Sequence, residues 1–180
     1  MQSRKEFIIQ FVGLSLGEHK YQFKITDKFF EDLGFSEMKQ GDINVDLNLI
    51  KQSSMMIFHF KIDGIVKTEC DRCLGELDLP ITGTYKLVVK VGGHETDDED
   101  DDIINVAANE HQLDLTQFIY EYIALSMPAK RIHPESKTGK SECDIEMLKK
   151  LDDFITENEP EGGDEPIDPR WEGLKGIDLN

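Results

Sequence analysis

The sequence predicts an α+β fold, in which an antiparallel, β-rich N-terminal part is followed by two helices. Apolar and polar residues alternate through most of residues 1–92, which is the period-two pattern of half-buried strands. Residues 109–155 carry apolar residues at helical spacing instead. Between these parts, seven of the eight residues from Glu95 to Asp102 are acidic, so we expect a solvated loop at 93–102.

The first predicted elements are short. An apolar run predicts a strand at Glu6–Phe11, and alternation at His19–Ile25 predicts a second strand. The segment Lys28–Leu33 predicts a short helix, which ends at Gly34 because glycine favours the backbone turn after a helix.

The most regular alternation follows, in two neighbouring strands and then in a third that ends at Val91. The apolar residues of the first two strands are Ile43, Val45, Leu47 and Leu49, then Met56, Phe58, Phe60 and Ile62. Gly64 predicts a bulge or bend. Such a succession of strands is typical of an antiparallel meander or a partly closed barrel.

Two helices are predicted in the second part. The first spans Asn109–Met127, with Asp114 as its N-terminal cap and Gln117 in the position of a capping box. The second spans Ile145–Ile155, with Asp144 as its cap.

These elements predict a single domain over residues 1–155, followed at 156–180 by an acidic linker and a short tail. The linker is rich in proline, glycine and acidic residues. The tail carries Arg170 and the chain's one tryptophan, Trp171. Because a lone tryptophan usually packs against another surface, we expect the tail to dock on its own domain or on a partner.

The composition restricts the classes of function. A net charge of −17 disfavours contact with a nucleic-acid backbone, since that contact depends on Lys and Arg. The same charge favours a basic partner or serves solubility. The sequence predicts neither a signal peptide nor a membrane span, and its three cysteines do not make a disulfide framework, so we expect a cytoplasmic protein. Without a phosphate-binding glycine loop, a nucleophile elbow or a catalytic triad in the sequence, we expect neither an enzyme nor a small-molecule substrate.

The most informative motif is Cys70-Asp71-Arg72-Cys73, on a turn between two predicted strands. Two thiols at this spacing bind one ion together in structural zinc sites. His133 and Cys143 offer a second pair, although the nine residues between them are a looser spacing than that of a zinc finger. The four residues form a candidate ligand set for a structural Zn²⁺.

Two other interpretations of the thiols stay open. A redox-active Cys-x-x-Cys pair normally precedes a helix, which lowers the pKa of its first thiol. Here the residues from Leu74 to Ile81 predict an extended segment instead. In the second interpretation, the cysteines neither bind a metal nor take part in redox chemistry and are plain buried or surface thiols.

One basic stretch stands out in this acidic chain. It contains Lys130, Arg131, Lys137 and Lys140, within an irregular loop predicted at 127–143. A local contact with RNA is one hypothesis for this loop, and a solvated surface is the alternative.

The chain resembles the YceD family, the large ribosomal RNA subunit accumulation proteins. The resemblance covers the whole chain and is carried by the segments 17–23, 70–74 and 113–115, by Met127-Pro128, and by the tail at 168–174. It implies a role in the synthesis, processing or stability of 23S ribosomal RNA, hence in assembly of the large subunit, without a known enzymatic activity. Many family members carry further cysteines after the helix proline, where this chain has His133 and Cys143.

Together, charge and resemblance predict a non-enzymatic assembly factor that acts mainly through protein contacts. Its expected partner is a basic ribosomal protein, or an assembly or RNA-processing factor, since acidic loops speed encounter with a basic surface. Two rival hypotheses remain. One is a thiol redox protein that uses Cys70 and Cys73, and the other is an acidic mimic of nucleic acid.

Overall fold

The computed structural model describes residues 6–34, 36, 38–92, 103–135 and 141–157. The chain divides into two units, Met1–Cys143 and Asp144–Asn180, and each is described by itself. All the described strands and helices α1 and α2 belong to the first unit, and helix α3 belongs to the second. The domain boundary that the sequence predicts at residue 155 stays a prediction.

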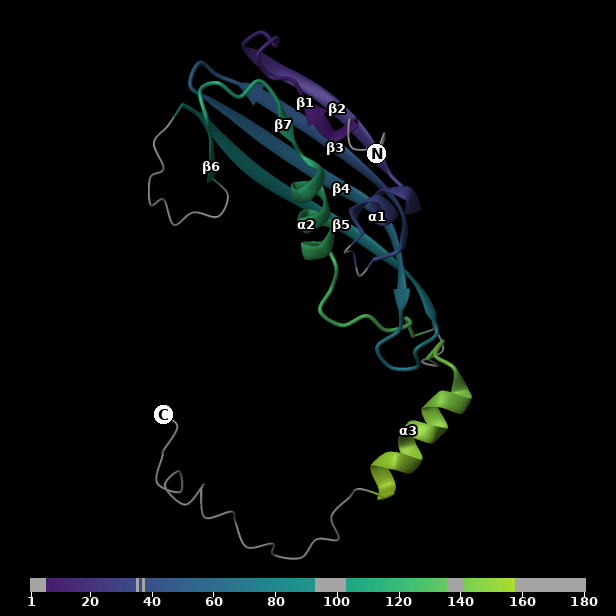
Figure 1. Cartoon of the computed structure of the whole chain (residues 1–180). Coiled ribbons are helices and arrows are strands. Elements are labelled where there is room, and N and C mark those ends of the chain that lie inside the picture. Colours follow the sequence, from purple (N-terminus) through teal and green to yellow (C-terminus); the bar gives the residue numbers. More distant parts are fainter. Residues whose placement is uncertain (1–5, 35, 37, 93–102, 136–140, 158–180) are drawn as a thin grey trace, which may run out of the picture. The chain divides into compact units, whose positions relative to one another are not determined.

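A five-stranded sheet forms the body of the first unit, in the order β2-β3-β4-β5-β6 (Figure 1). Neighbouring strands run antiparallel, except that β6 pairs with β5 in parallel. The strands are β2 (Gly17–Ile25), β3 (Gln40–Lys51), β4 (Met55–Glu69), β5 (Glu76–Val91) and β6 (Ile103–Val106). The α+β prediction is confirmed, and the described sheet is an open meander with β2 and β6 at its edges.

The alternation seen in the sequence decides which face of the sheet is buried. Every apolar residue predicted to share a face of β3 and β4 is at most 2% exposed, from Ile43 to Ile62. Burying a side chain of this size contributes about 1.5–3 kcal/mol. The intervening residues of both strands are mostly polar and exposed. One face of the sheet is therefore core, and the other is surface.

The strand pairing runs through Gly64 without interruption, with Ile43 on one side and Ile81 on the other. The bulge predicted there is wrong. A Cβ atom at position 64 would overlap the backbone of Asp42 and Ile43. Glycine is needed because the neighbouring strand approaches so closely.

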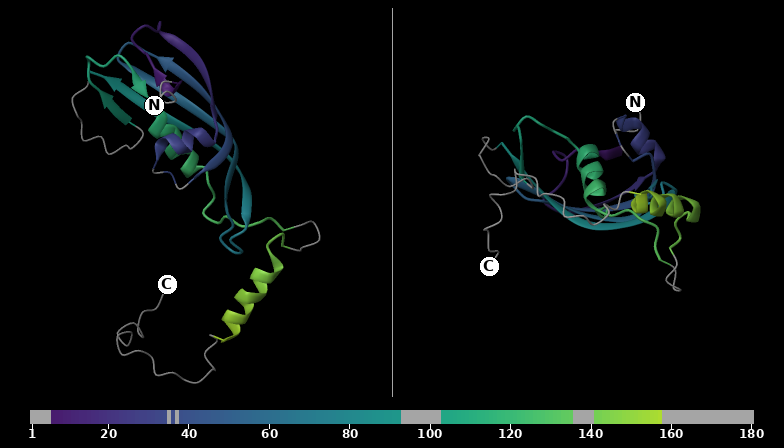
Figure 2. Two further views of the ribbon diagram at one scale, coloured as in Figure 1. Left: turned by 45° about the vertical axis from the view of Figure 1, so that its right-hand side comes forward. Right: turned by 90° about the horizontal axis from the view of Figure 1, so that it is seen from below.

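Two helices and a two-stranded ladder lie on the buried face of the sheet (Figure 2). The helices are α1 (Asp27–Leu33) and α2 (Thr116–Leu125), and the ladder joins β1 (Ile8–Ile9) to β7 (Leu113–Asp114). The ring of Tyr122 on α2 stacks on Tyr85 of β5, with centroids 4.6 Å apart. Helix α1 ends as predicted at Gly34, whose φ is 73°.

Helix α2 is shorter than predicted, because the residues before it pair with the N-terminal segment. Leu113 and Asp114 form β7, so the helix begins at Thr116. Asp114 still accepts a hydrogen bond from the Thr116 backbone N–H at 2.8 Å. The cap is Leu115 and makes no side-chain cap hydrogen bond, so the predicted Asp114 cap and the capping box are both wrong. The Gln117 side chain donates to Glu121 instead. The pairing of β7 with β1, which is distant in the sequence, thus overrides the local helical periodicity.

The second unit contains α3 (Ile145–Glu157), close to its predicted bounds. Asp144 caps it as expected, accepting hydrogen bonds from the backbone N–H groups of Glu146 and Met147 at 2.8 and 3.3 Å. None of the described helices is long and apolar enough to cross a membrane. The predicted acidic loop at 93–102 and the tail lie outside the described residues.

Candidate metal centre

The connection between β4 and β5 folds into a tight hook that holds two buried thiols. The Cys70 N–H donates to the Gly75 carbonyl and the Leu74 N–H to the Cys70 carbonyl, each at 2.9 Å. Leu74 has φ 58°, a left-handed conformation that a side chain with a Cβ rarely adopts. Cys70 and Cys73 are 0% and 4% exposed. The backbone of the hook therefore turns both sulfur atoms inward.

A later segment of the chain is clamped to this hook by Asp71. The Asp71 N–H donates to the Arg131 carbonyl at 2.7 Å, and the Arg131 N–H donates back to Asp71 Oδ2 at 2.8 Å. The guanidinium of Arg131 also pairs with Asp71 Oδ1 at 3.0 Å. The pKa of Asp71 is lowered, mainly by the hydrogen bond from the Arg131 N–H and then by the Arg131 guanidinium. This clamp places His133, two residues further on, beside the thiols.

The structure brings the four predicted ligands together. Their ligand atoms all lie within 4.8 Å of one another. Cys70 Sγ is 3.8 Å from Cys143 Sγ, and Cys73 Sγ is 3.4 Å from His133 Nδ1. A tetrahedral zinc ion would separate two sulfur ligands by about 3.8 Å, and a sulfur from a nitrogen by about 3.6 Å. A disulfide would need sulfur atoms about 2.05 Å apart, and all three cysteines are free.

His133 is oriented by a second partner on the hook. Its Nε2 lies 2.9 Å from the Glu76 carbonyl oxygen, which only an N–H can satisfy. This hydrogen bond leaves Nδ1, the atom that faces Cys73, with its lone pair free for a metal. The pKa of His133 is raised, most by the hydrogen bond to the Glu76 carbonyl and next by the Cys70 thiol.

The electrostatics of the thiols suit a cation. Burial raises the pKa of Cys70, but backbone N–H groups of Cys73, Arg72 and His133 outweigh it and lower that pKa to about 6. For Cys143 the hydrogen bond with Ser141 lowers the pKa, but burial and the neighbouring Cys70 and Cys73 raise it. A bound cation would counter the burial and the neighbouring thiols that raise the pKa of Cys143. Three soft thiols and an imidazole, mutually placed as above, fit a metal ion.

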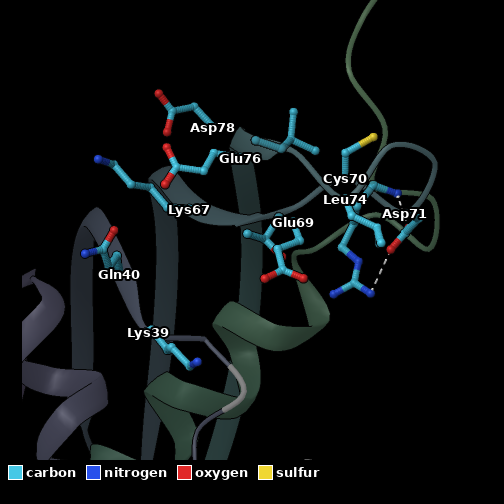
Figure 3. A pocket seen from close by; sticks show the side chains of 12 residues that line it. Lys39, Gln40, Lys67, Glu69, Cys70, Asp71, Leu74, Glu76 and Asp78 are labelled. Carbon is cyan, nitrogen blue, oxygen red and sulfur yellow. Dashed lines mark hydrogen bonds and ion pairs between the residues drawn. The ribbon is translucent and has the colours of Figure 1, made fainter. Parts of the chain in front are cut away.

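A groove of about 740 Å³ opens beside the hook (Figure 3). The groove is lined by basic side chains, namely Lys39, Lys67 and Arg131, and by acidic ones, among them Glu69 and Asp78. The Leu74 side chain also lines this groove and is 65% exposed. A strained backbone position that presents an apolar side chain to solvent is the kind of feature found at binding surfaces.

Two of the six predicted partner-binding residues belong to the described part of the chain. Lys130 is exposed, but Arg131 is engaged with Asp71. The other residues of that prediction lie outside the described part of the chain: Lys137, Lys140, Arg170 and Trp171. Sequence reasoning missed the role of Asp71, whose only signal was a carboxylate between two metal-ligand candidates.

Fold and site define a class of protein: a meandering sheet whose end is closed by a cysteine hook, with a histidine and a third cysteine brought against it from a later loop. The family model for YceD, the large ribosomal RNA subunit accumulation protein, matches residues 58–178, about two thirds of the chain. The chain belongs to this family. The match begins within β4 and includes all four cluster residues. No curated protein and no solved structure gives a match.

Proposed function

We propose that this protein is a non-enzymatic cytoplasmic factor for 23S ribosomal RNA synthesis, processing or stability, and so for large-subunit assembly. Membership of the YceD family supports the ribosomal role. The carrying observation for the mechanism is the cluster of Cys70, Cys73, His133 and Cys143. We take it as a structural zinc site, because four protein ligands leave no open position for substrate or water.

Burial supports a structural role over a redox one. Reactive thiols are normally partly exposed, whereas all three cysteines here are at most 4% exposed. The depressed pKa of Cys70 serves a thiolate ligand equally well. Zinc, when bound, would tie residues 70–73 to residues 133–143 and stiffen the groove beside Leu74.

The factor acts mainly through protein contacts made at this stiffened end. Leu74 supplies an apolar contact, and the mixed charges around the groove set its specificity. The net charge of −17 favours a basic partner, either a ribosomal protein or an assembly or RNA-processing factor.

Complementation tests this function. Cells that lack the protein are supplied with wild type or with Cys73→Ser, and the ratio of 23S to 16S RNA and the large-subunit peak in sucrose gradients are measured. Wild type should restore both, and the variant should not. If the variant rescues the cells as well as wild type does, the metal cluster is not needed for this function.

Affinity capture at low salt separates the proposal from its rivals. Ribosomal proteins or assembly factors are expected with wild type, whereas a polymerase or nucleoid protein would favour a nucleic-acid mimic. Thiol titration decides the redox alternative. We expect the thiols to react only after a chelator removes zinc, and fast reaction in the zinc-loaded protein would support redox chemistry.

A further inference from the structure

The acidity of this chain is concentrated in two segments. Residues 93–102 contain seven acidic and no basic residues, and residues 141–180 contain 13 acidic and four basic ones. The rest of the chain holds 17 acidic and 16 basic residues and is almost neutral. The average charge therefore says little about the surface of the sheet, and a local contact with nucleic acid is not opposed there.

Basic side chains gather on the exposed face of the sheet, in its half nearest the β3–β4 hairpin. Strand pairing aligns Lys20 of β2, Asn48 of β3, His59 of β4 and Lys86 of β5 in one row across the strands. Lys61 follows on the same face of β4. The three lysines and His59 are all exposed. An open groove of about 890 Å³ crosses these strands, lined by Lys20, His59 and Lys61 among others.

These cations are largely free of internal partners. Among the described residues, Lys20, Lys61 and Lys86 form no ion pair, unlike Lys24 of the same face, which pairs with Asp42. The acidic positions nearest to these lysines on the same face are Glu18, Asp46, which pairs directly with Lys61 in the strand register, and Asp63, two residues further along β4. Asp46 already accepts a hydrogen bond from Gln22 at 2.8 Å. The row of Lys20, Asn48, His59 and Lys86 itself contains two lysines and no acidic residue, so it presents positive charge to solvent.

The face suits phosphates better than bases. The outward positions of the described strands β2 to β5 carry no Phe, Tyr or Trp on which a base would stack. Tyr21, Phe60 and Tyr85 also line the groove, but they occupy the alternate, core-facing positions of their strands. Phe60 is buried there, and Tyr85 stacks on Tyr122. Lysines without such platforms neutralise phosphates and read no sequence.

We propose that this face, through Lys20, Lys61 and Lys86, with His59 between them in the groove, binds the phosphate backbone of RNA without base readout. The site lies about 10 residues along β4 from the hook, or about 33 Å at the usual strand rise. RNA and the protein partner would thus occupy separate ends of one sheet. The inference goes beyond the proposed function, which rests on the metal-centre end.

The test uses the purified full chain and a fluorescein-labelled 20-nucleotide single-stranded U-only RNA, with fluorescence anisotropy from 50 to 300 mM KCl. Wild type should bind with a strong salt dependence. The variant Lys20→Gln/Lys61→Gln/Lys86→Gln should lose about tenfold in affinity at low salt, and the slope of log K against log salt should fall by about 2. A mixed-sequence RNA of the same length should bind as well as the U-only RNA.

The matched control Lys24→Gln/Lys28→Gln/Lys67→Gln removes equal charge from exposed positions outside the row. It should bind nearly as wild type, and both triple variants should melt as wild type does. Equal losses in the two variants would overturn the proposal, as would no salt-dependent binding by wild type. Row-dependent binding of poly-glutamate but not RNA would overturn it in favour of an acidic protein. These outcomes come from purified components, so they stand apart from rescue by Cys73→Ser in cells.

Discussion

The two ends of the sheet contrast in how they are built. At the hook, thiols are buried, the backbone is strained at Leu74, and the Asp71–Arg131 clamp fixes the approach of His133. At the hairpin end, the lysine row is exposed and makes no ion pair among the described residues. The two proposed contacts therefore rest on different properties, rigidity at the hook and charge at the lysine row. Four changes to the hook end should therefore alter its stability or its protein contacts and leave RNA affinity almost unchanged.

The largest effect is expected from removing a ligand or the metal itself. Cys73→Ser, or wild type with a strong chelator, should lose bound zinc and several kcal/mol of stability, which lowers the melting temperature by about 10 °C. Zinc stoichiometry and calorimetry measure this. Chelator should have no further effect on the variant. An unchanged melt in every case would show that neither a bound metal nor the Cys73 thiol contributes to stability.

Exchanging the histidine separates ligand chemistry from packing. His133→Ala should release zinc, because one of the four ligands is lost. His133→Cys should retain it, since a thiolate replaces the imidazole in many zinc sites. The thiolate-to-metal charge-transfer absorption of the cobalt-substituted proteins would report the added thiolate ligand. Equal zinc content in wild type and both variants would exclude His133 as a ligand.

Loosening the clamp should have a smaller effect. Asp71→Asn removes the charge that pairs with Arg131 and should weaken zinc binding about tenfold, as loss of an outer-shell partner typically does. Competition with a zinc indicator gives the affinity. Asp63→Asn, an exposed aspartate elsewhere on β4, is the matched control and should bind as wild type. A similar loss of zinc affinity in both variants would show that the effect comes from the overall charge of the protein.

The smallest change at the hook has opposite effects on stability and on binding. Leu74→Gly relieves a left-handed backbone that costs a non-glycine residue about 1–2 kcal/mol, so the protein should melt a few degrees higher. The same change deletes the exposed apolar contact, and captured partner protein should decrease. If the variant melts higher but captures as much partner protein as wild type does, Leu74 is strained without contacting the partner, and the partner binds elsewhere.

Much of the fold follows from local pattern, and the rest depends on distant contacts. Alternation on β3 and β4 predicted which residues are buried, and the Cys-x-x-Cys spacing pointed to the hook. The pairing of β7 with β1 joins residues more than 100 positions apart, which local periodicity does not encode. The parallel addition of β6 and the Asp71–Arg131 clamp are also long-range. The lysine row became visible only once strand register was known.

The separation of Cys70 and Cys143 by 73 residues has a physiological consequence. An ion bound between them would act as a removable crosslink. Because only the folded chain brings the ligands together, the free energy of binding the ion would add to the stability of the fold. A cell starved of zinc would lose that tether and expose the factor to proteolysis. On the function proposed above, large-subunit assembly would then slow as the metal supply falls, with no separate sensor.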